Sequence, residues 1–324
     1  MTDVLIAPTL RDIYAARDRI RDVIVPTPLL QHPLLAATLG CTVRVKHENH
    51  NPTCAFKVRG GLNLVGSLAR DARQGGVITA STGNHGQSIA FACQRAAVPC
   101  TVAVPHGNNP EKNAAMRAFG ATVVEHGADF DEAREWVERT AVERELRYVH
   151  SANEPLLIAG VGTYALEIFE EWPDVDVVFV PIGGGSGACG LVTVRSALGA
   201  DTRIIGVQAE RADAFARSWT TGARIAGASA DTFAEGMATR VTFDLTFEIL
   251  QRELDDIVTL TEDELAAGVR TALATTHNLA EGAGAAAIAA AIKRKDQLRG
   301  LNVVCVMSGG NIDAQKLRWV LGVA

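Results

Sequence analysis

Two kinds of hydrophobic pattern alternate along this chain. Short apolar runs rich in valine and isoleucine recur, and most are followed by a longer segment with apolar positions at helical spacing. The clearest short run, residues 177–180, is Val-Val-Phe-Val, as expected of a strand that is buried on both faces. The short runs predict strands at 41–48, 76–80, 100–104, 121–125, 148–150, 176–181, 203–209, 256–260 and 303–307. The longer patterns predict helices at 9–25, 84–97, 110–119, 129–145, 155–171, 188–198, after Thr261 and at 282–292, an amphipathic run at 60–70 and irregular structure at 212–238.

The regular alternation of strands and helices predicts an α/β protein with parallel sheets covered by helices. We expect two parallel-sheet lobes with a cleft between them: a small lobe at 55–150 and a large lobe formed by 1–54 and 151–324. Glycine-containing loops follow three of the predicted strands, at 81–86, 183–187 and 308–311. Because such sheets bind ligands at the carboxyl ends of their strands, these loops predict a ligand site in the cleft.

Composition narrows the classes of partner. With 324 residues, 48% of them hydrophobic, the chain is long enough for two lobes with separate cores. The net charge is −6 at pH 7 and no basic tract is present, which argues against nucleic acid as a partner. The amino terminus lacks a secretory pattern and no apolar run reaches about 18 residues, so we expect a cytoplasmic protein without membrane association. The six cysteines and eight histidines show no metal-ligand spacing, which predicts reduced thiols and no metal site.

The loop Gly183-Gly184-Gly185-Ser186-Gly187 lies between a predicted strand and a predicted helix. Consecutive backbone amides without β-carbons suit the phosphate of a monoester. A dinucleotide site is the main alternative, but its fingerprint needs separated glycines and an acidic residue about 20 residues later, where this chain has Gln208. A plain flexible turn is the third interpretation, and we rank the phosphate site first.

Lys57, in Ala55-Phe56-Lys57-Val58-Arg59-Gly60-Gly61, is the candidate reactive group. Most lysines lie on solvated faces, so a surface lysine at a helix start is the ordinary alternative. A cation is, however, unfavourable at the positive end of a helix. A pyridoxal phosphate site needs a lysine amine that forms a Schiff base, a glycine loop for the phosphate and polar loops at strand ends. This chain offers all three.

Taken together, the segments around Lys57, 81–86, 183–187 and 308–311 resemble those of the fold-type II pyridoxal phosphate enzymes, which share the tryptophan synthase β-like fold. The resemblance runs nearly end to end, from Thr27-Pro28-Leu29 to the last helix, and is specifically to the serine/threonine dehydratase and serine racemase group. It implies pyridoxal 5′-phosphate as the cofactor, bound by the large lobe, a small-molecule amino acid as substrate, and a homodimer.

The resemblance implies a role for each loop that faces the cofactor. Lys57 would carry the cofactor as a Schiff base, and burial beside Phe56 would lower the pKa of its amine so that it is neutral and nucleophilic. Ser308 would face the pyridine nitrogen, and its hydroxyl cannot keep that nitrogen protonated, which weakens the electron sink and suits β-elimination. The implied cofactor-binding residues are Phe56, Lys57, Asn84, Gly183, Gly184, Gly185, Ser186, Gly187, Glu281 and Ser308.

The loop Ser81-Thr82-Gly83-Asn84-His85-Gly86 is similar to the asparagine loop of the group, which receives the substrate carboxylate at a helix amino terminus. Asn84 would also hydrogen-bond the phenolic oxygen of the cofactor. A helix cap by Ser81 or Thr82 is the alternative role and is compatible with a site, and His85 is expected to be packed in place rather than to act as a base. The implied substrate-binding residues are Ser81, Thr82, Gly83, Asn84, His85 and Arg134.

Two features depart from the pattern of the group. Thr82 stands where similar serine racemases place a second serine as the base on the far face of the substrate; its hydroxyl could take that catalytic role, but the extra methyl group weakens it. Gln208 and Ala214 replace acidic ligands of the group's divalent-cation site, although Glu210 and Asp213 lie nearby. Metal activation is therefore not expected.

These features predict a pyridoxal phosphate-dependent dehydratase that converts L-threonine, L-serine or both to a 2-oxo acid and ammonia by β-elimination. The alternatives in this class are a serine racemase and a threo-3-hydroxyaspartate dehydratase. The latter would use Arg134, which aligns with a carboxylate-binding arginine of the racemase group, although a pair with Glu138 on a charged helix face is its more ordinary role. The alternative from another class is a non-catalytic small-molecule or nucleotide-binding protein with the same glycine loop.

Overall fold

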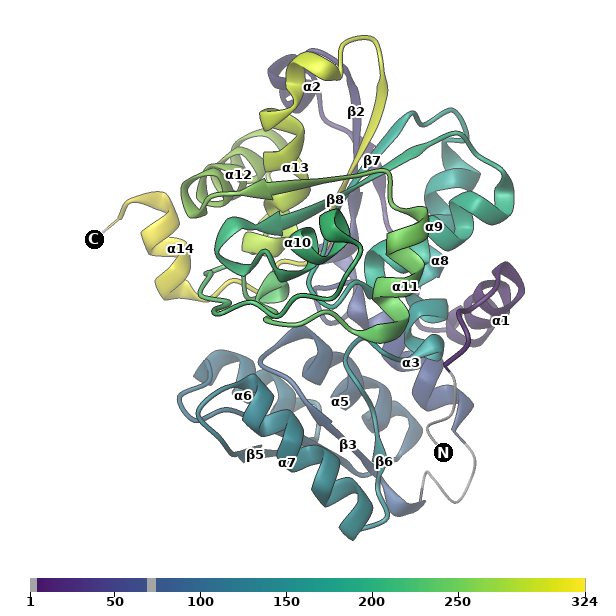
Figure 1. Cartoon of the computed structure of the whole chain (residues 1–324), viewed down its shortest axis with the longest axis vertical. Helices are drawn as coiled ribbons and strands as arrows, with labels where there is room; N and C mark the ends of the chain where they lie inside the picture. The colour runs from purple at the N-terminus through teal and green to yellow at the C-terminus, as the bar shows by residue number, and fades with distance from the viewer. Residues whose placement is uncertain (1–4, 69–73, 324) are drawn as a thin grey trace.

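The computed structural model describes residues 5–68 and 74–323 and contains two β-sheets, each covered by helices (Figure 1). The larger sheet has six strands in the order β1-β2-β10-β7-β8-β9, and the smaller has four in the order β5-β4-β3-β6. The strands of the larger sheet are β1 (Leu29–Gln31), β2 (Thr42–His47), β7 (Val177–Pro181), β8 (Arg203–Ala209), β9 (Asp256–Leu260) and β10 (Asn302–Met307). Those of the smaller sheet are β3 (Val77–Ala80), β4 (Cys100–Val104), β5 (Thr122–Glu125) and β6 (Arg147–Tyr148).

Within the described residues, every pair of neighbouring strands is parallel except β1 and β2. Strand β10 lies between β2 and β7, with Val303 opposite both Val43 and Val177. Segments from the two ends of the chain therefore meet at the centre of one sheet. The parallel sheets confirm the predicted α/β fold class.

Alternate residues of the strands in the larger sheet are buried on opposite faces. Val303 and Cys305 of β10 belong to a core shared with α2, α12 and α13, whereas Val304 and Val306 belong to a core shared with α1, α8, α9 and α11. The helices of this lobe are α1 (Leu10–Ile20), α2 (Pro33–Leu39), α8 (Pro155–Glu171), α9 (Ser186–Leu198), α10 (Ala214–Thr221), α11 (Asp244–Glu253), α12 (Glu262–Thr276), α13 (Gly282–Lys293) and α14 (Ala314–Leu321). Its 3₁₀ turns are η1 (Glu48–His50), η2 (Glu210–Ala212), η3 (Glu235–Met237) and η4 (Lys295–Gln297).

The smaller sheet is covered on both faces in the same manner. Ile78 and Ala103 pack against α7, whereas Val77 and Val102 pack against α3, α5 and α6. These helices are α3 (Lys57–Ser67), α5 (Asn84–Ala96), α6 (Pro110–Ala118) and α7 (Phe130–Glu143).

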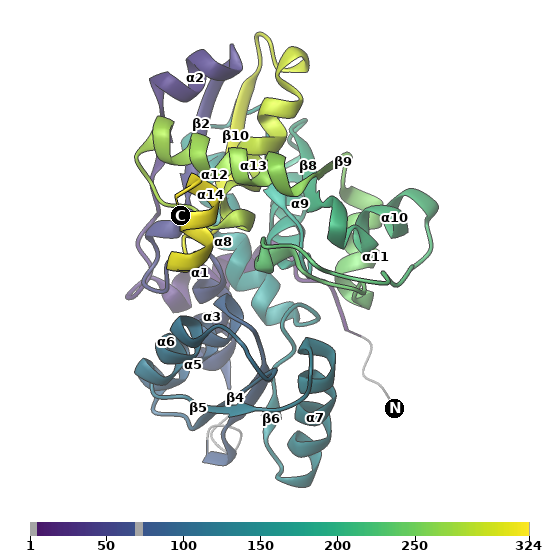
Figure 2. The ribbon, with the colours of Figure 1, turned by 90° about the vertical axis from the view of Figure 1, so that its left-hand side faces the viewer.

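Helix α3 lies at the junction of the two lobes, where it packs on α5 and on α8 (Figure 2). A β-carbon at Gly60 would lie 2.9 Å from the carbonyl oxygen of Leu157, and one at Gly61 would lie 2.3 Å from Oγ of Ser88. The two glycines therefore allow α3 to approach both neighbouring helices closely. Since Lys57 is the first residue of α3, this packing places it between the lobes.

Most predicted elements are present with shifted ends, and a few predictions are wrong. The helix expected at 9–25 ends at Ile20, and Thr9 forms a capping box at its start. The segment expected to be irregular, 212–238, contains α10, whose eight residues are too few to show a helical period. The short elements β1 and α2 and the ten-residue helix α11 were also not predicted. Residues 69 and 70 of the predicted amphipathic run lie outside the described residues, and the lobe boundaries after residues 54 and 150 stay a prediction.

Candidate active site

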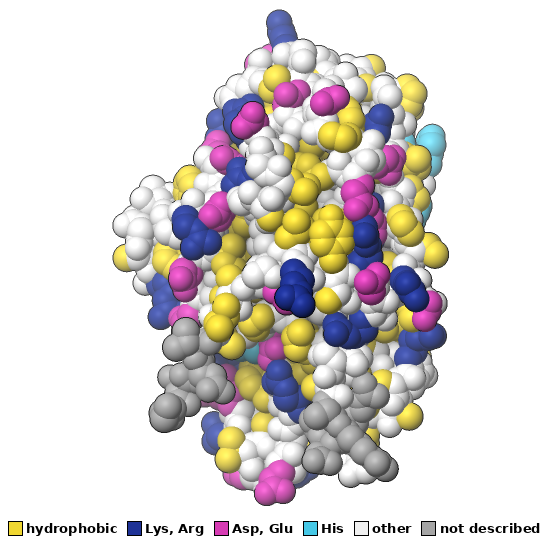
Figure 3. Space-filling view, turned by 90° about the vertical axis from the view of Figure 1, so that its right-hand side faces the viewer, with side chains coloured by type: hydrophobic (Ala, Val, Ile, Leu, Met, Phe, Trp, Pro, Cys, Tyr) yellow, Lys and Arg dark blue, Asp and Glu magenta, His cyan; other side chains and the backbone are white. Residues whose placement is uncertain are grey.

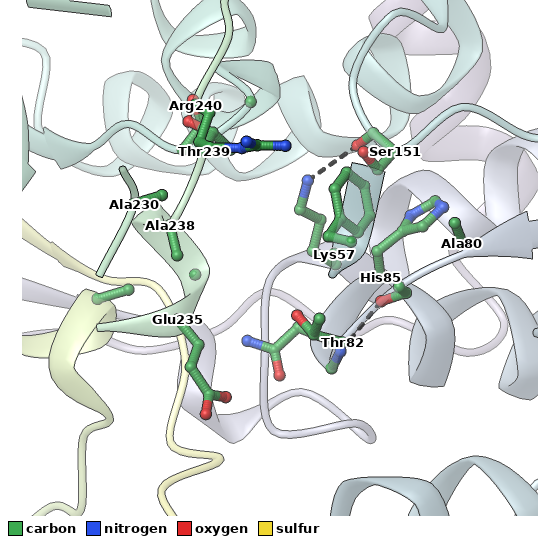
Figure 4. Close-up of a pocket in the computed structure, with 18 of the residues that line it drawn as sticks. Lys57, Ala80, Thr82, His85, Ser151, Ala230, Glu235, Ala238, Thr239 and Arg240 are labelled. Carbon is green, nitrogen blue, oxygen red and sulfur yellow. Dashed lines mark hydrogen bonds between the residues drawn. The ribbon is translucent and has the colours of Figure 1, made fainter. Parts of the chain in front are cut away.

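A cavity of about 610 Å³ opens between the lobes at the carboxyl ends of β3, β7 and β10 (Figure 4). One side is lined by segments 80–85 and 105–109 of the smaller lobe, and the other by segments 181–187 and 228–241 of the larger lobe. Lys57 and Ser308 also line it. The structure therefore brings together the lysine and the strand-end loops that the sequence singled out.

Lys57 is held by two hydrogen bonds within this cavity. Its Nζ donates to the carbonyl oxygen of Ser151 and to Oγ of Ser186, each at 3.1 Å, and lies 5.4 Å from the centre of the Phe56 ring. Burial lowers the pKa of its amine to about 8. An appreciable fraction is therefore neutral near physiological pH, which is the state needed to attack a carbonyl group.

The lowered pKa predicts how fast the protein will react with an aldehyde. Only the neutral amine attacks, and its fraction rises as the pH passes through about 8 instead of 10.5. We expect the rate at which cofactor-free protein forms a Schiff base with pyridoxal phosphate to rise with pH and to level off above about 9. Stopped-flow absorbance between pH 6 and 11 would measure it. A rate that keeps rising up to pH 11 would show that burial does not lower this pKa.

The 183–187 loop leaves β7 and starts α9 with little space around its glycines. A β-carbon at Gly183 would lie 2.2 Å from the carbonyl oxygen of Gly236, and Gly185 has a φ of +93°. The hydroxyl of Tyr164 donates a hydrogen bond to the carbonyl oxygen of Gly187 at 2.8 Å. The loop is thus a fixed turn that presents backbone amides at a helix amino terminus, which is a suitable site for a phosphate.

In the 81–86 loop, Ser81 is engaged within the backbone. Its Oγ accepts hydrogen bonds from the amides of Gly83 and Gly86, at 3.1 and 2.8 Å, and so caps the start of α5. Thr82 lies in the cavity wall opposite Glu235 (Figure 4).

Asn84 is the centre of a second set of hydrogen bonds at the cavity. Its Nδ2 donates to Oε1 of Glu281 at 2.6 Å, and its Oδ1 accepts from Nδ2 of Asn311 at 2.8 Å. Burial raises the pKa of Glu281. The hydroxyl of Ser308 donates to the carbonyl oxygen of Ala283 at 3.4 Å. Asn84, Glu281 and Ser308 therefore meet at one end of the cavity although they lie far apart in the sequence.

His85 has the environment of a packed neutral histidine. Oγ1 of Thr79 donates to the carbonyl oxygen of Val149 at 2.7 Å, so it must accept from Nε2 of His85 at 2.8 Å. Burial lowers the pKa of His85 well below its usual value. Its Nε2 proton is donated to Thr79, and the packing role of His85 stays a prediction.

Two arginines of this region have different positions. Arg134 pairs with Glu138 at 2.6 Å along α7, and it is not among the described residues that line the cavity. Arg240 does line the cavity, near Thr239 and facing the side that carries Lys57 (Figure 4). Its guanidinium reaches across to Asp131 at 2.5 Å and to Asp129 at 3.1 Å. Among the described residues it is the one arginine that lines the cavity, and sequence analysis missed it.

Sequence analysis also missed three further residues that line the cavity: Lys112, Glu235 and Ser151. Glu235, like Arg240, lies in the segment at 228–241, which has no hydrophobic period, and Lys112 lies on an ordinary helix. These side chains reach the cavity only because the lobes meet, and no local sequence signal marks them.

Gln208 is buried and bridges two backbone groups. Its Nε2 donates to the carbonyl oxygen of Ile182 at 3.3 Å, and its Oε1 accepts from the amide of Ala216 at 2.8 Å. In the part of the chain that the structure describes, no group of three or more histidine, cysteine or acidic residues could hold a metal ion. The expectation that no metal is needed stays a prediction.

A buried lysine of lowered pKa beside a glycine loop that suits a phosphate, in a cleft between two α/β lobes, is typical of an enzyme that forms a Schiff base with a phosphorylated aldehyde. Residues 20–309 match the family described as pyridoxal-phosphate dependent enzyme. The chain belongs to this family.

Relatives and solved structures agree with this assignment. The chain is 36% identical to L-threonine ammonia-lyase of Thermotoga maritima over 309 residues. The aligned region covers 95% of this chain and 77% of that protein. The structure of the processed form of threonine deaminase isoform 2 from Solanum lycopersicum matches with a TM-score of 0.90 and 32% identity, covering 99% of this chain and 96% of that one. Maize serine racemase matches with a TM-score of 0.92 and 25% identity, covering 98% of each chain.

The cofactor of this family, pyridoxal phosphate, fits the residues present. The backbone amides of the 183–187 loop could hold its phosphate. A β-carbon at Gly183 or Gly184 would lie within 2.6 Å of a neighbouring atom, so only glycine fits this turn without a shift of its neighbours. Lys57 could bind its aldehyde carbon, and the ring of Phe56 lies beside the amine.

Proposed function

We propose that this chain is a pyridoxal phosphate-dependent ammonia-lyase that converts L-threonine, L-serine or both to a 2-oxo acid and ammonia by β-elimination. The observation that carries the proposal is the amine of Lys57, of lowered pKa, in the cavity between the 183–187 loop and the 81–86 loop. The similarity to the L-threonine ammonia-lyase of Thermotoga maritima supports the choice of substrate.

The side chains at the cavity then have distinct roles. When bound through Lys57, pyridoxal phosphate supplies an electron sink for the negative charge that develops at the substrate α-carbon. The amine of Lys57 takes the proton from that carbon. Ser151 and Ser186 accept hydrogen bonds from Nζ and so hold the amine in place between proton transfers. Ser308 would face the pyridine nitrogen with a hydroxyl, which cannot keep that nitrogen protonated as a carboxylate would, and a weaker electron sink would favour early loss of the β-hydroxyl.

Further cofactor contacts belong to the same proposal. Asn84, held by Glu281 and Asn311, would bind the phenolic oxygen, and the amides of the 183–187 loop would bind the phosphate. The 81–86 loop binds the substrate carboxylate at the amino terminus of α5.

The decisive experiment is a substrate panel. Serine, threonine and 3-hydroxyaspartate isomers would each be incubated with the cofactor-loaded protein and assayed for 2-oxo acid. The proposal requires rapid conversion of L-threonine or L-serine, and no 2-oxo acid from either would refute it. A threo-3-hydroxyaspartate substrate is the alternative that the cavity position of Arg240 favours. Since Asp129 and Asp131 already pair with Arg240, we place threonine and serine first.

Thr82 predicts that elimination outruns racemisation. Reprotonation on the far face needs a positioned acid, and the hydroxyl of Thr82 is more hindered than that of a serine. We expect L-serine to be converted to pyruvate faster than it is converted to D-serine. Thr82→Ser should raise the yield of D-serine several-fold, and Thr82→Val should remove D-serine formation. Chiral chromatography alongside a pyruvate assay would measure both products. Faster racemisation than elimination in the unaltered protein would contradict this role of Thr82.

We also propose a cytoplasmic homodimer. Within the described ranges, no helix combines the length and the hydrophobicity needed to cross a bilayer. Figure 3 shows hydrophobic side chains gathered near the middle of the face that is on the right in Figure 1, bordered by charged residues. Such a patch is typical of an association surface, and sedimentation velocity would give the mass of the assembly.

A further inference from the structure

We propose that Lys112 is a charged ligand of the substrate carboxylate. The inference rests on the proposed function, because it places that carboxylate at the 81–86 loop. It adds a side chain of α6 to the amides of that loop, so that the negative charge of the substrate strengthens binding.

Lys112 lies directly against the loop. A β-carbon built on Gly83 would lie 3.2 Å from Cδ and 3.4 Å from Nζ of Lys112. The Lys112 side chain is only 9% exposed, and the residue lines the cavity. Gly83 immediately precedes α5, so the ammonium group lies beside the positive end of that helix. Glu235 already supplies one anion to this ammonium group, and the positive helix end beside it favours a second.

The ammonium group has hydrogen-bonding capacity left for that anion. It carries three N–H donors, and within the described chain its one acceptor is a carboxylate oxygen of Glu235. The loop itself has few donors left, because Ser81 already occupies the amides of Gly83 and Gly86. The amides of Asn84 and His85, in the first turn of α5, remain without an intrahelical acceptor. Two amides and two ammonium N–H groups together match the four lone-pair sites of a carboxylate.

The carboxylate that pairs with Lys112 is shared with a second lysine. Glu235 also accepts a hydrogen bond from Lys316, which pairs in turn with Asp313 at 2.8 Å. Glu235 therefore stays paired when Lys112 turns part of its donor capacity toward a ligand. Arg240 also lines the cavity, but its guanidinium group is less free to turn toward a ligand because it pairs with both Asp129 and Asp131.

The test compares a ligand that has the carboxylate with one that lacks its charge. L-Alanine and L-alaninamide have no β-leaving group, so their binding to the cofactor-loaded protein can be measured by calorimetry without elimination. Lys112→Met should weaken L-alanine by about 10- to 100-fold, the range for a hydrogen bond to a charged group, and leave L-alaninamide nearly unchanged. Lys316→Met is the matched control: it removes the other cation from Glu235, but Lys316 does not line the cavity among the described residues, and the preference for L-alanine should persist.

Several outcomes would overturn the proposal. Equal weakening of both ligands by Lys112→Met would mean that Lys112 only shapes the cavity, and an equal effect of Lys316→Met would mean that the whole ion-pair network matters. If Lys112→Met does not fold, Lys112→Arg and Lys112→Gln replace it, with retention of the L-alanine preference expected for the first and loss for the second. The absence of 2-oxo acid from any β-hydroxy amino acid would refute the proposed function instead, since the calorimetric comparison needs no turnover.

Discussion

Lys57→Ala should abolish conversion of the substrate and leave the fold intact. The variant removes both the amine that binds the cofactor and the base that takes the α-proton, so we expect a loss of at least about 10³-fold. Alanine is a good helix former at the first position of α3, and only the hydrogen bonds to Ser151 and Ser186 are lost. Assays for 2-oxo acid and circular dichroism would separate activity from folding.

Chemical labelling gives this prediction an independent check. Borohydride reduction of the cofactor-loaded protein should fix the cofactor to Lys57, and peptide mapping would locate it. Lys293→Ala is a suitable control, because Lys293 lies on the surface and pairs with Glu264 at 2.9 Å. It should keep both activity and labelling. A cofactor adduct on another lysine, or substantial activity in Lys57→Ala, would show that Lys57 is not the reactive group.

Sequence patterns predicted the parts of the fold that depend on local order. The apolar run at 177–180 predicts a buried strand, and the glycines after it predict a turn, because both follow from residues that are adjacent in the chain. The same logic placed the strand-end loops at one edge, where the structure has them. Short elements such as α10 were missed because eight residues span little more than two turns.

The contacts between the lobes could not be predicted from the sequence. Arg134 was chosen by resemblance, but on α7 it pairs with Glu138 one turn away. Arg240, from a segment without regular structure, lies at the cavity because the lobes meet there. The position of Lys112 against Gly83 likewise depends on how α6 packs beside α5. Side chains that reach a site through tertiary packing leave no spacing signal along the chain.

Arg59 shows how the scaffold holds Lys57, which lies two residues earlier on α3. It is fully buried, and its guanidinium donates to Glu48 through Nε at 2.7 Å and to Glu167 through Nη1 at 2.5 Å. Further hydrogen bonds go to the hydroxyl groups of Thr27 and Thr163, at 3.3 and 3.0 Å. One side chain thus ties α3 to the 3₁₀ turn after β2 and to α8.

Arg59→Met should destabilise the protein strongly. Methionine fills a similar volume but leaves the carboxylates of Glu48 and Glu167 without their shared cation. Lys46 forms a direct ion pair with Glu167, at 2.6 Å, and attracts Glu48 without a hydrogen bond to it. Removing one partner of a buried ion pair costs about 3–5 kcal/mol of unfolding free energy, because an uncompensated charge stays buried. Arg17→Met is the matched control: Arg17 pairs with Glu170 at 2.7 Å, but both side chains are at least 41% exposed, so its loss should cost about 0–1 kcal/mol. Urea unfolding of the three proteins, followed by circular dichroism, would give the differences. A loss of unfolding free energy under about 1 kcal/mol for Arg59→Met, or one equal to that of Arg17→Met, would show that the buried ion pairs of Arg59 do not hold α3, and with it Lys57, in place.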